Sequence, residues 1–132
     1  MSPNKRSILC VEDDKDNSDL LTYLFESEGF EVTTCGTVEE CLYQALQRNF
    51  DAIILDNRLG HTTTVGACQE IRKNDPHVPI IYYSGESRPA EIEKALSECA
   101  VAYLVKPDDF EKLVPTIIKL IQEASVQVEN SF

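Results

Sequence analysis

The chain has 132 residues, with 23 acidic and 12 basic side chains and a formal net charge of −11 at pH 7. This length fits one domain with its own hydrophobic core. The acidic excess argues against binding of nucleic acid or of an anionic membrane through the bulk surface, because both carry negative charge. Divalent cations and partners with basic surfaces remain compatible with it.

The spacing of the cysteines and the N-terminal segment predict the cellular compartment of the protein. The five cysteines are odd in number, widely spaced and without a C-x-x-C pair, which indicates neither a disulfide framework nor a zinc site. We expect reduced thiols in a cytoplasmic protein, some of them buried as small apolar side chains. The apolar-leaning run near the N-terminus is five residues long, too short for a signal peptide or a membrane span.

The first part of the chain alternates strand and helix patterns. Residues 8–11 form an apolar run that ends in acids, and a cap at residue 16 or 17 opens a helix that Gly29 ends. FEVTTC at residues 30–35 alternates as a strand does. Thr37 then begins a capping box, TVEE, before the second helix.

The stretch FDAIILDNRLG, from Phe50 to Gly60, contains the most informative strand. Residues 52–55 are apolar without alternation, which is typical of a strand covered on both faces in a parallel sheet. The run ends on Asp56, and open α/β sheets bind ligands at the carboxyl ends of their strands. Asp56 is therefore a candidate reactive residue, with capping of the following turn as the alternative interpretation.

The following segments complete the alternation. Glycine and three threonines in HTTTVGACQEIRKNDP predict a short or frayed third helix. Residues 80–83 are a fourth strand that ends on Ser84, and Pro89 fits the first turn of a fourth helix. Residues 101–105 form the fifth strand, followed by Lys106-Pro107.

An aspartate at residue 108 or 109 caps the last predicted helix, in which Pro115 should kink the chain or delay regular hydrogen bonding. We expect one domain over residues 1–124 and a polar, flexible tail over residues 125–132. Alternating strands and helices predict an α/β, doubly wound, five-stranded parallel sheet. We expect a flavodoxin-like strand order of 2-1-3-4-5, which is common in such sheets but which the residue pattern alone does not determine.

Polar residues follow four of these strands and should meet at one edge of the sheet. They are Glu12-Asp13-Asp14, Asp56, Ser84 and Lys106. Clustered carboxylates raise one another's pKa unless a cation lies among them, and hard oxygen ligands suit Mg²⁺. An acid, a metal, a lysine and a hydroxyl together fit phosphoryl transfer to an aspartate.

The segments ILCVEDD, IILDNRL, IIYYSGE and YLVKP occur in the order of the landmarks of the response-regulator receiver domains of two-component signalling. The chain resembles that family over about residues 6 to 124. The resemblance implies a flavodoxin-like (βα)5 fold. It also implies a signalling domain that promotes only its own phosphoryl transfer and dephosphorylation and is not otherwise an enzyme.

The resemblance further implies roles for individual residues around a Mg²⁺ ion. Asp56 resembles the phosphoacceptor and also a metal ligand. Asp13 resembles a direct metal ligand, and Glu12 a ligand acting through water. Arg58 would offer its backbone carbonyl to the metal.

A second group of residues resembles the part of the family's site that holds the phosphoryl group. Ser84 and Lys106 resemble the residues that contact it, and Tyr103 resembles the aromatic switch residue. Lys106-Pro107 is the family's cis-peptide position. The side chains of Arg58 and Glu86 lie at rate-tuning positions and are expected to pair across the mouth of the site.

The loop after Asp56 departs from the family pattern. Gly60 stands where the family usually has proline, and Thr64 where it commonly has glycine. We therefore expect a looser loop, with His61 exposed to solvent.

The sequence thus predicts a cytoplasmic, stand-alone receiver without an output domain. It would accept a phosphoryl group from a sensor histidine kinase or phosphotransfer protein, and signal to a downstream protein or by forming a homodimer, through the face of the fourth helix, fifth strand and fifth helix. No contact with nucleic acid or membrane is expected.

Two alternatives remain. A haloacid-dehalogenase-type Mg²⁺ phosphohydrolase needs a second aspartate where Arg58 stands. A receiver-like binding module that is never phosphorylated would have lost an acid or the lysine, and neither is lost here.

Overall fold

The computed structural model describes the backbone of residues 5–130 and the side chains up to residue 126. Its elements in chain order are β1 (Ser7–Val11), α1 (Lys15–Ser27), β2 (Glu31–Cys35), α2 (Val38–Gln47), β3 (Ala52–Leu55), β4 (Arg58–Leu59), β5 (Thr62–Thr63), α3 (Val65–Asn74), β6 (Ile80–Ser84), α4 (Pro89–Glu98), β7 (Ala102–Val105), the 3-10 turn η1 (Phe110–Lys112) and α5 (Leu113–Asn130).

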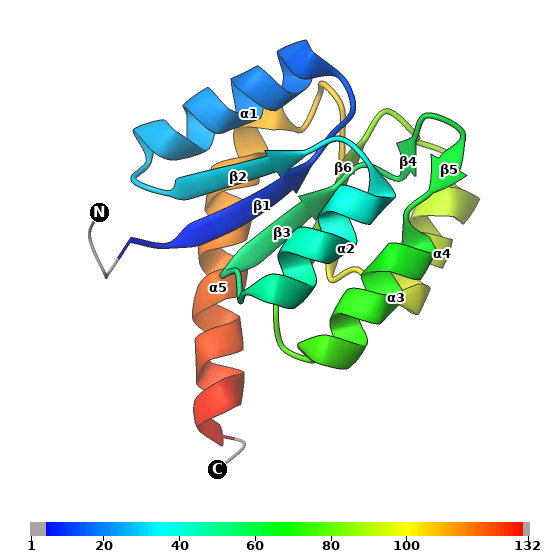
Figure 1. Ribbon diagram of the computed structural model, residues 1–132. Helices are drawn as coiled ribbons and strands as arrows, with labels where there is room; N and C mark the ends of the chain where they lie inside the picture. Colours follow the sequence, from blue (N-terminus) through cyan, green and yellow to red (C-terminus); the bar gives the residue numbers. More distant parts are fainter. Residues whose placement is uncertain (1–4, 131–132) are drawn as a thin grey trace.

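The main sheet has five parallel strands in the order β2-β1-β3-β6-β7. With β6 and β7 as the fourth and fifth predicted strands, this confirms the flavodoxin-like order. Helices α1 and α5 cover one face of the sheet and α2, α3 and α4 the other (Figure 1). Among the described residues no helix has the length and apolarity needed to cross a bilayer.

Both faces of the sheet are packed, which explains the apolar runs without alternation. In β3, Ile53 and Leu55 pack with the α2, α3 and α4 side, while Ala52 and Ile54 pack with the α1 and α5 side. All four residues are buried. Because no strand of this kind has a solvent face, every position favours an apolar side chain until the strand ends.

Local capping follows the sequence with two corrections. The expected cap of the last helix at residue 108 or 109 is wrong, because Asp109 precedes the 3-10 turn η1 without a side-chain capping bond and its carboxylate accepts from the Val105 N–H at 2.8 Å instead. Thr37 caps α2 by accepting a hydrogen bond from the Glu40 N–H at 3.1 Å, as predicted. Gly29 follows the end of α1 with φ of +89°, which only glycine adopts without strain. The N-cap of α1, however, is Asp14, which accepts from the Asn17 N–H at 3.0 Å. The expectation of a cap at residue 16 or 17 is wrong because the acid run itself caps the helix.

Two helices are longer than expected. The ten residues of α3 equal those of α2 and α4, so the third helix is not shortened. Pro115 is the third residue of α5, where its missing N–H would have no partner inside the helix. The helix continues to Asn130, so the expected boundary at residue 124 is not the end of an element. Residues 131 and 132 lie outside the described range.

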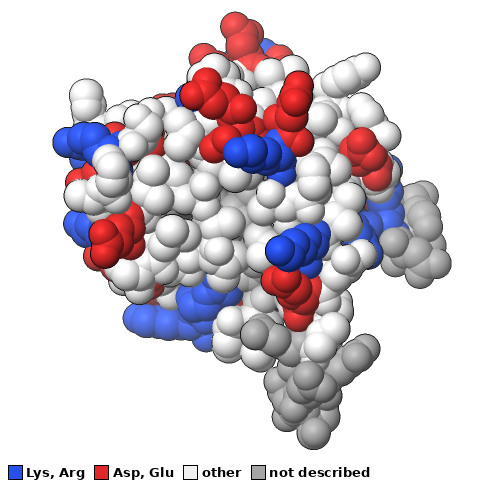
Figure 2. All heavy atoms as spheres, turned by 180° about the vertical axis from the view of Figure 1, so that it is seen from behind, with Lys and Arg blue, Asp and Glu red and all other residues white. Residues whose placement is uncertain are grey.

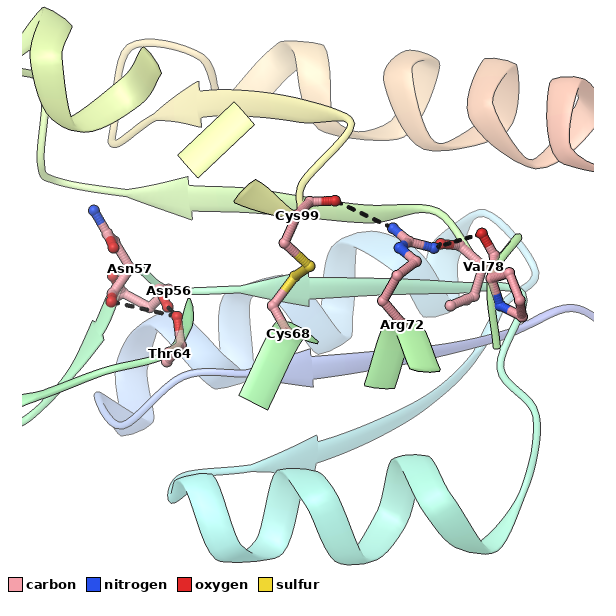
Figure 3. Close-up of a disulfide and its surroundings, with 8 residues drawn as sticks. Asp56, Asn57, Thr64, Cys68, Arg72, Val78 and Cys99 are labelled. Carbon is pink, nitrogen blue, oxygen red and sulfur yellow. Dashed lines mark hydrogen bonds between the residues drawn. A yellow bond between two sulfur atoms is a disulfide. The ribbon is translucent and has the colours of Figure 1, made fainter. Parts of the chain in front are cut away.

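The expectation that all cysteines are free thiols is wrong for two of them. Cys68 in α3 and Cys99 at the end of α4 form a disulfide (Figure 3). Residues 31 apart in sequence meet because α3 and α4 are neighbours on one face of the sheet. The three other cysteines are free and buried, as expected: Cys10, Cys35 and Cys41.

Candidate functional site

The carboxyl ends of four strands place the predicted polar residues together. Val11 of β1 and Leu55 of β3 are paired in register, so Glu12 and Asp56 leave the sheet side by side. The Lys106 N–H, after β7, donates to the Ser84 carbonyl at the end of β6 at 2.8 Å. The site is therefore built by strand register, with each functional residue at or directly after a strand end.

Lys106 joins the buried Glu12 to the half-buried Asp56. Its Nζ donates to Glu12 Oε2 at 2.7 Å and to Asp56 Oδ2 at 2.8 Å. The side chains of Lys106 and Asp56 are each 15% exposed, and that of Glu12 is 3% exposed. One cation thus compensates two carboxylates that water reaches poorly.

The ionisation of this group is set by burial and by the mutual contacts. Burial raises the pKa of Glu12. The hydrogen bonds from Lys106 and from Asn17 Nδ2, the latter at 3.1 Å, lower this pKa but do not outweigh the burial. Burial works against the charge on Lys106, but the hydrogen bonds to Asp56 and Glu12 outweigh it and hold the lysine pKa above its usual value. The site therefore keeps its ammonium charge while carrying an excess of carboxylate.

The third acid, Asp13, lies at the exposed rim. One carboxylate oxygen each from Glu12, Asp13 and Asp56 lies within 4.8 Å of the others. Hard oxygen donors around an open position fit Mg²⁺, which keeps several water ligands. Asp13 Oδ2 accepts a hydrogen bond from the Gly60 N–H at 2.8 Å, which holds this carboxylate against the following loop.

That loop is an ordered hairpin and not the loose segment expected. Strands β4 and β5 pair through Arg58 with Thr63 and through Leu59 with Thr62, and Gly60 turns with φ of +61°. His61 is exposed, as expected. The hairpin brings the Gly60 N–H to the acidic cluster.

Thr64 anchors the start of α3 to the backbone at Asp56. Its fully buried hydroxyl donates to the Asp56 carbonyl at 2.7 Å and lies 3.3 Å from the Asn57 carbonyl (Figure 3). The Thr64 N–H also donates to the Asn57 carbonyl at 3.1 Å. The threonine at position 64, where the family commonly has glycine, thus adds hydroxyl contacts that glycine could not make.

Tyr103 lies on the edge strand β7, beside Tyr82 of β6. Its hydroxyl donates to the Glu86 carbonyl at 2.8 Å and accepts from Asn57 Nδ2 at 3.4 Å. Ser84 is buried, and its Oγ accepts from the Glu86 N–H at 3.2 Å. Tyr103 therefore bridges the segment after Asp56 and the segment after Ser84.

The expected ion pair between Arg58 and Glu86 is wrong. Glu86 pairs with Arg88 two residues further on, and this contact holds the pKa of Glu86 down to about 2. Arg58 is exposed, and its N–H lies 3.5 Å from Asp56 Oδ1. A nearby partner within the same loop has replaced the partner across the site. The metal-binding role of the Arg58 carbonyl remains a prediction.

The peptide bond between Lys106 and Pro107 is cis, as the resemblance implied. Sequence reasoning did not find Asn17, Asn57 or Thr64, all of which contact the site through hydrogen bonds. Asn17 lies on the first turn of α1, three residues after the acidic run, and this proximity is the only signal that could have pointed to it.

The sequence-family model of the response regulator receiver domain matches residues 8–118 of the chain. The chain belongs to this family. Curated relatives of this receiver include the transcriptional regulatory protein ZraR of Escherichia coli O157:H7, which is 27% identical over 126 residues; these are 96% of this chain and 29% of the relative. The phosphate regulon transcriptional regulatory protein PhoB of Rhizobium meliloti (strain 1021) is 30% identical over 123 residues, 92% of this chain and 54% of the relative. The receiver thus spans about a third to half of their lengths.

Solved structures agree with this assignment. A CheY-like receiver domain protein from Methanospirillum hungatei JF-1 has a TM-score of 0.87 at 24% identity, covering 94% of this chain and 99% of that one, and shows the fold. The receiver domain of the sensor histidine kinase PA1611 of Pseudomonas aeruginosa PAO1 has a TM-score of 0.80 at 28% identity, covering 89% and 98%. That structure has a magnesium ion coordinated in its active-site cleft.

Proposed function

We propose that this receiver accepts a phosphoryl group on the Asp56 carboxylate from a sensor histidine kinase or a phosphotransfer protein. The contact of Lys106 with Asp56 and Glu12, in a cleft with little exposure, is the observation that carries this proposal. An Asp56 oxygen forms the new bond to phosphorus while the donor's bond to phosphorus breaks. Lys106 is already within hydrogen-bond distance of Asp56, so its charge stabilises the transferred oxygens.

Mg²⁺ is the proposed cofactor, and it would neutralise charge on the phosphoryl oxygens. Asp13 is exposed and bonded only to a backbone N–H among the described contacts, so it can turn to the metal as a direct ligand. Glu12 is occupied by Lys106 and Asn17, which favours a role through water. The Arg58 carbonyl completes the proposed set. Magnesium in the cleft of the PA1611 receiver supports this proposal.

The signal is proposed to leave through the face of α4, β7 and α5. Ser84 ends the strand before α4, and Lys106 follows β7, so both groups that would close on a phosphoryl oxygen are attached to this face. Tyr103 joins the two segments through its hydroxyl. A displacement at the site can therefore favour one of two arrangements of these elements.

A separate downstream protein or a second copy of this receiver is the proposed reader, with no output domain in the same chain required. The NtrC4 receiver, 25% identical with a TM-score of 0.83, forms a dimer when activated with beryllofluoride, which supports the second case. Figure 2 shows acidic and basic side chains next to one another around a largely uncharged central area on the face opposite to that of Figure 1. A partner with basic residues at the rim of its interface fits the net charge of −11.

The test is incubation with acetyl phosphate, with and without Mg²⁺, followed by intact mass and peptide mapping. We expect one phosphoryl group on Asp56, formed only with Mg²⁺ and released by hydroxylamine, as an acyl phosphate is. Asp56→Asn should abolish it, and Asp19→Asn, at an exposed acid on α1, should leave it intact. An Asp56→Asn variant that still gains one hydroxylamine-sensitive group contradicts the proposal.

A further inference from the structure

Helix α4 is held to the core by little apolar burial. Ala95 is its one buried residue, and Leu96 is 43% exposed. Its N-cap residue, Arg88, makes no side-chain capping bond. A partly open pocket of about 50 Å³ lies between α4 and the start of α3, lined in part by Tyr82, whose buried hydroxyl has no hydrogen-bond partner among the described residues. Helices with few buried contacts open locally at low free-energy cost.

Two contacts with α3 hold the C-terminal end of α4. The first is the Cys68–Cys99 disulfide, and the second is a hydrogen bond of 3.4 Å from Arg72 Nη2 to the Cys99 carbonyl (Figure 3). Arg72 also donates to the Val78 carbonyl just before β6. The disulfide is thus the one covalent attachment of α4 outside its own chain connections, within the part of the chain that the structure describes.

The same disulfide is one helical turn from the phosphoacceptor segment. The Cys68 N–H donates to the Thr64 carbonyl at 3.0 Å, and the Thr64 hydroxyl donates to the Asp56 carbonyl at 2.7 Å. Figure 3 shows Asp56, Asn57 and Thr64 beside the first part of α3, with Cys68 and Cys99 beyond them. One end of α4 therefore follows Ser84, and the other is tied through Cys68 to the backbone at Asp56.

We propose that the Cys68–Cys99 pair is a reversible redox restraint on α4, which fixes the C-terminal end of the helix to α3 when oxidised and releases it when reduced. In the reducing compartment that the sequence predicts, disulfides are usually transient or redox-sensing. The pair is then a second input to the surface through which this receiver signals.

The chemistry needs only a low-molecular-weight disulfide as oxidant. Cys99 is partly exposed and Cys68 is fully buried, so the Cys99 thiolate attacks first and expels one thiolate of the oxidant. The Cys68 thiolate then attacks the Cys99 sulfur of this mixed disulfide and expels the second thiolate. Two electrons pass from the cysteine pair to the oxidant, and the two protons end on its two thiols. A dithiol reductant reverses both steps.

Amide hydrogen exchange of the unphosphorylated protein tests the restraint directly. The protein is oxidised with glutathione disulfide or reduced with dithiothreitol, and alkylation in denaturant should modify three cysteines in the first form and five in the second. Exchange in residues 95–99 should rise by about tenfold or more on reduction, because disulfides commonly contribute at least this much to an opening equilibrium. Exchange in α1 should stay unchanged.

The matched control is the Cys68→Ala/Cys99→Ala double variant, which keeps the other three cysteines. It should exchange like the reduced protein, and dithiothreitol should not alter it. Equal exchange of α4 in oxidised and reduced wild type overturns the proposal, as does alkylation of all five cysteines after oxidation. Both results are read from the wild type, so they hold even where the variant folds poorly.

The link to signalling rests on the proposed function and has its own measurement. Phosphorylation with acetyl phosphate should itself change amide exchange in α4. In the oxidised form this change should be confined to the N-terminal half of the helix, and in the reduced form it should extend through residue 99. If Asp56 is not phosphorylated, the proposed function fails while the redox effect on unphosphorylated α4 stands. If phosphorylation occurs and the two forms respond alike, the coupling to the site is refuted.

Discussion

Replacing Lys106 with methionine should expose how strongly the site depends on one positive charge. Methionine keeps much of the length of the side chain and removes the ammonium that lies 2.7 Å from Glu12 and 2.8 Å from Asp56. At an effective dielectric constant of about 20, each attraction is worth about 6 kcal/mol before desolvation is subtracted. Removing one partner of a buried ion pair costs about 3–5 kcal/mol, because the remaining charges stay unpaired. We expect a loss in this range for the metal-free protein at pH 7.

Urea unfolding in EDTA and in saturating Mg²⁺ measures this loss. A bound cation would compensate the same carboxylates, so the deficit of Lys106→Met should shrink in Mg²⁺, and the variant should bind Mg²⁺ more tightly than the wild type. The control is Lys112→Met, which removes an exposed lysine paired with Asp109 and should change little. A metal-free deficit below about 1 kcal/mol, or one that Mg²⁺ does not reduce, would refute the reasoning.

Three further predictions follow from the same geometry. Asp13→Asn should weaken Mg²⁺ binding in calorimetry by about tenfold or more, whereas Asp14→Asn, at the neighbouring helix cap, should not. Burial raises the pKa of Glu12 in the folded protein. Its contribution to metal-free stability is therefore present below the unfolded pKa of about 4.3 and is lost as pH rises through the folded pKa. Glu12→Gln should remove this loss, so the free energy of unfolding in urea should depend less on pH between pH 4 and 7. Tyr103→Ala should weaken beryllofluoride-dependent association about fivefold or more in sedimentation, and an equal effect of Glu26→Lys on α1 would place the output surface elsewhere.

The fold and most of the site could be predicted because the signals are local. Each buried strand is an apolar run, and the residue after it has a fixed place at the edge of the sheet, as with Asp56 and Lys106. Thr37 and Gly29 act on their own helix ends, so their roles follow from sequence alone.

The features that were missed depend on contacts between distant elements or on competition between nearby partners. The Cys68–Cys99 bond requires α3 and α4 to be neighbours and their two cysteines to lie side by side, which the spacing of cysteines in the sequence does not show. The Thr64 hydroxyl reaches backbone carbonyls, which every residue carries and no pattern marks. Glu86 pairs with Arg88 in its own loop, a local partner that the sequence interpretation did not consider beside Arg58.

The hairpin at Gly60 has a consequence for how this chain can vary. The family's usual proline at this position would hold φ near −65°, whereas Gly60 has φ of +61°. Proline would also lack the N–H that reaches Asp13, which is 47 residues away in sequence. Restoring the common residue alone would therefore both deform the turn and release a carboxylate of the proposed metal site. Positions 13 and 60 are thus coupled in this chain through one backbone hydrogen bond, so the conformation of the loop bears directly on where the Asp13 carboxylate lies.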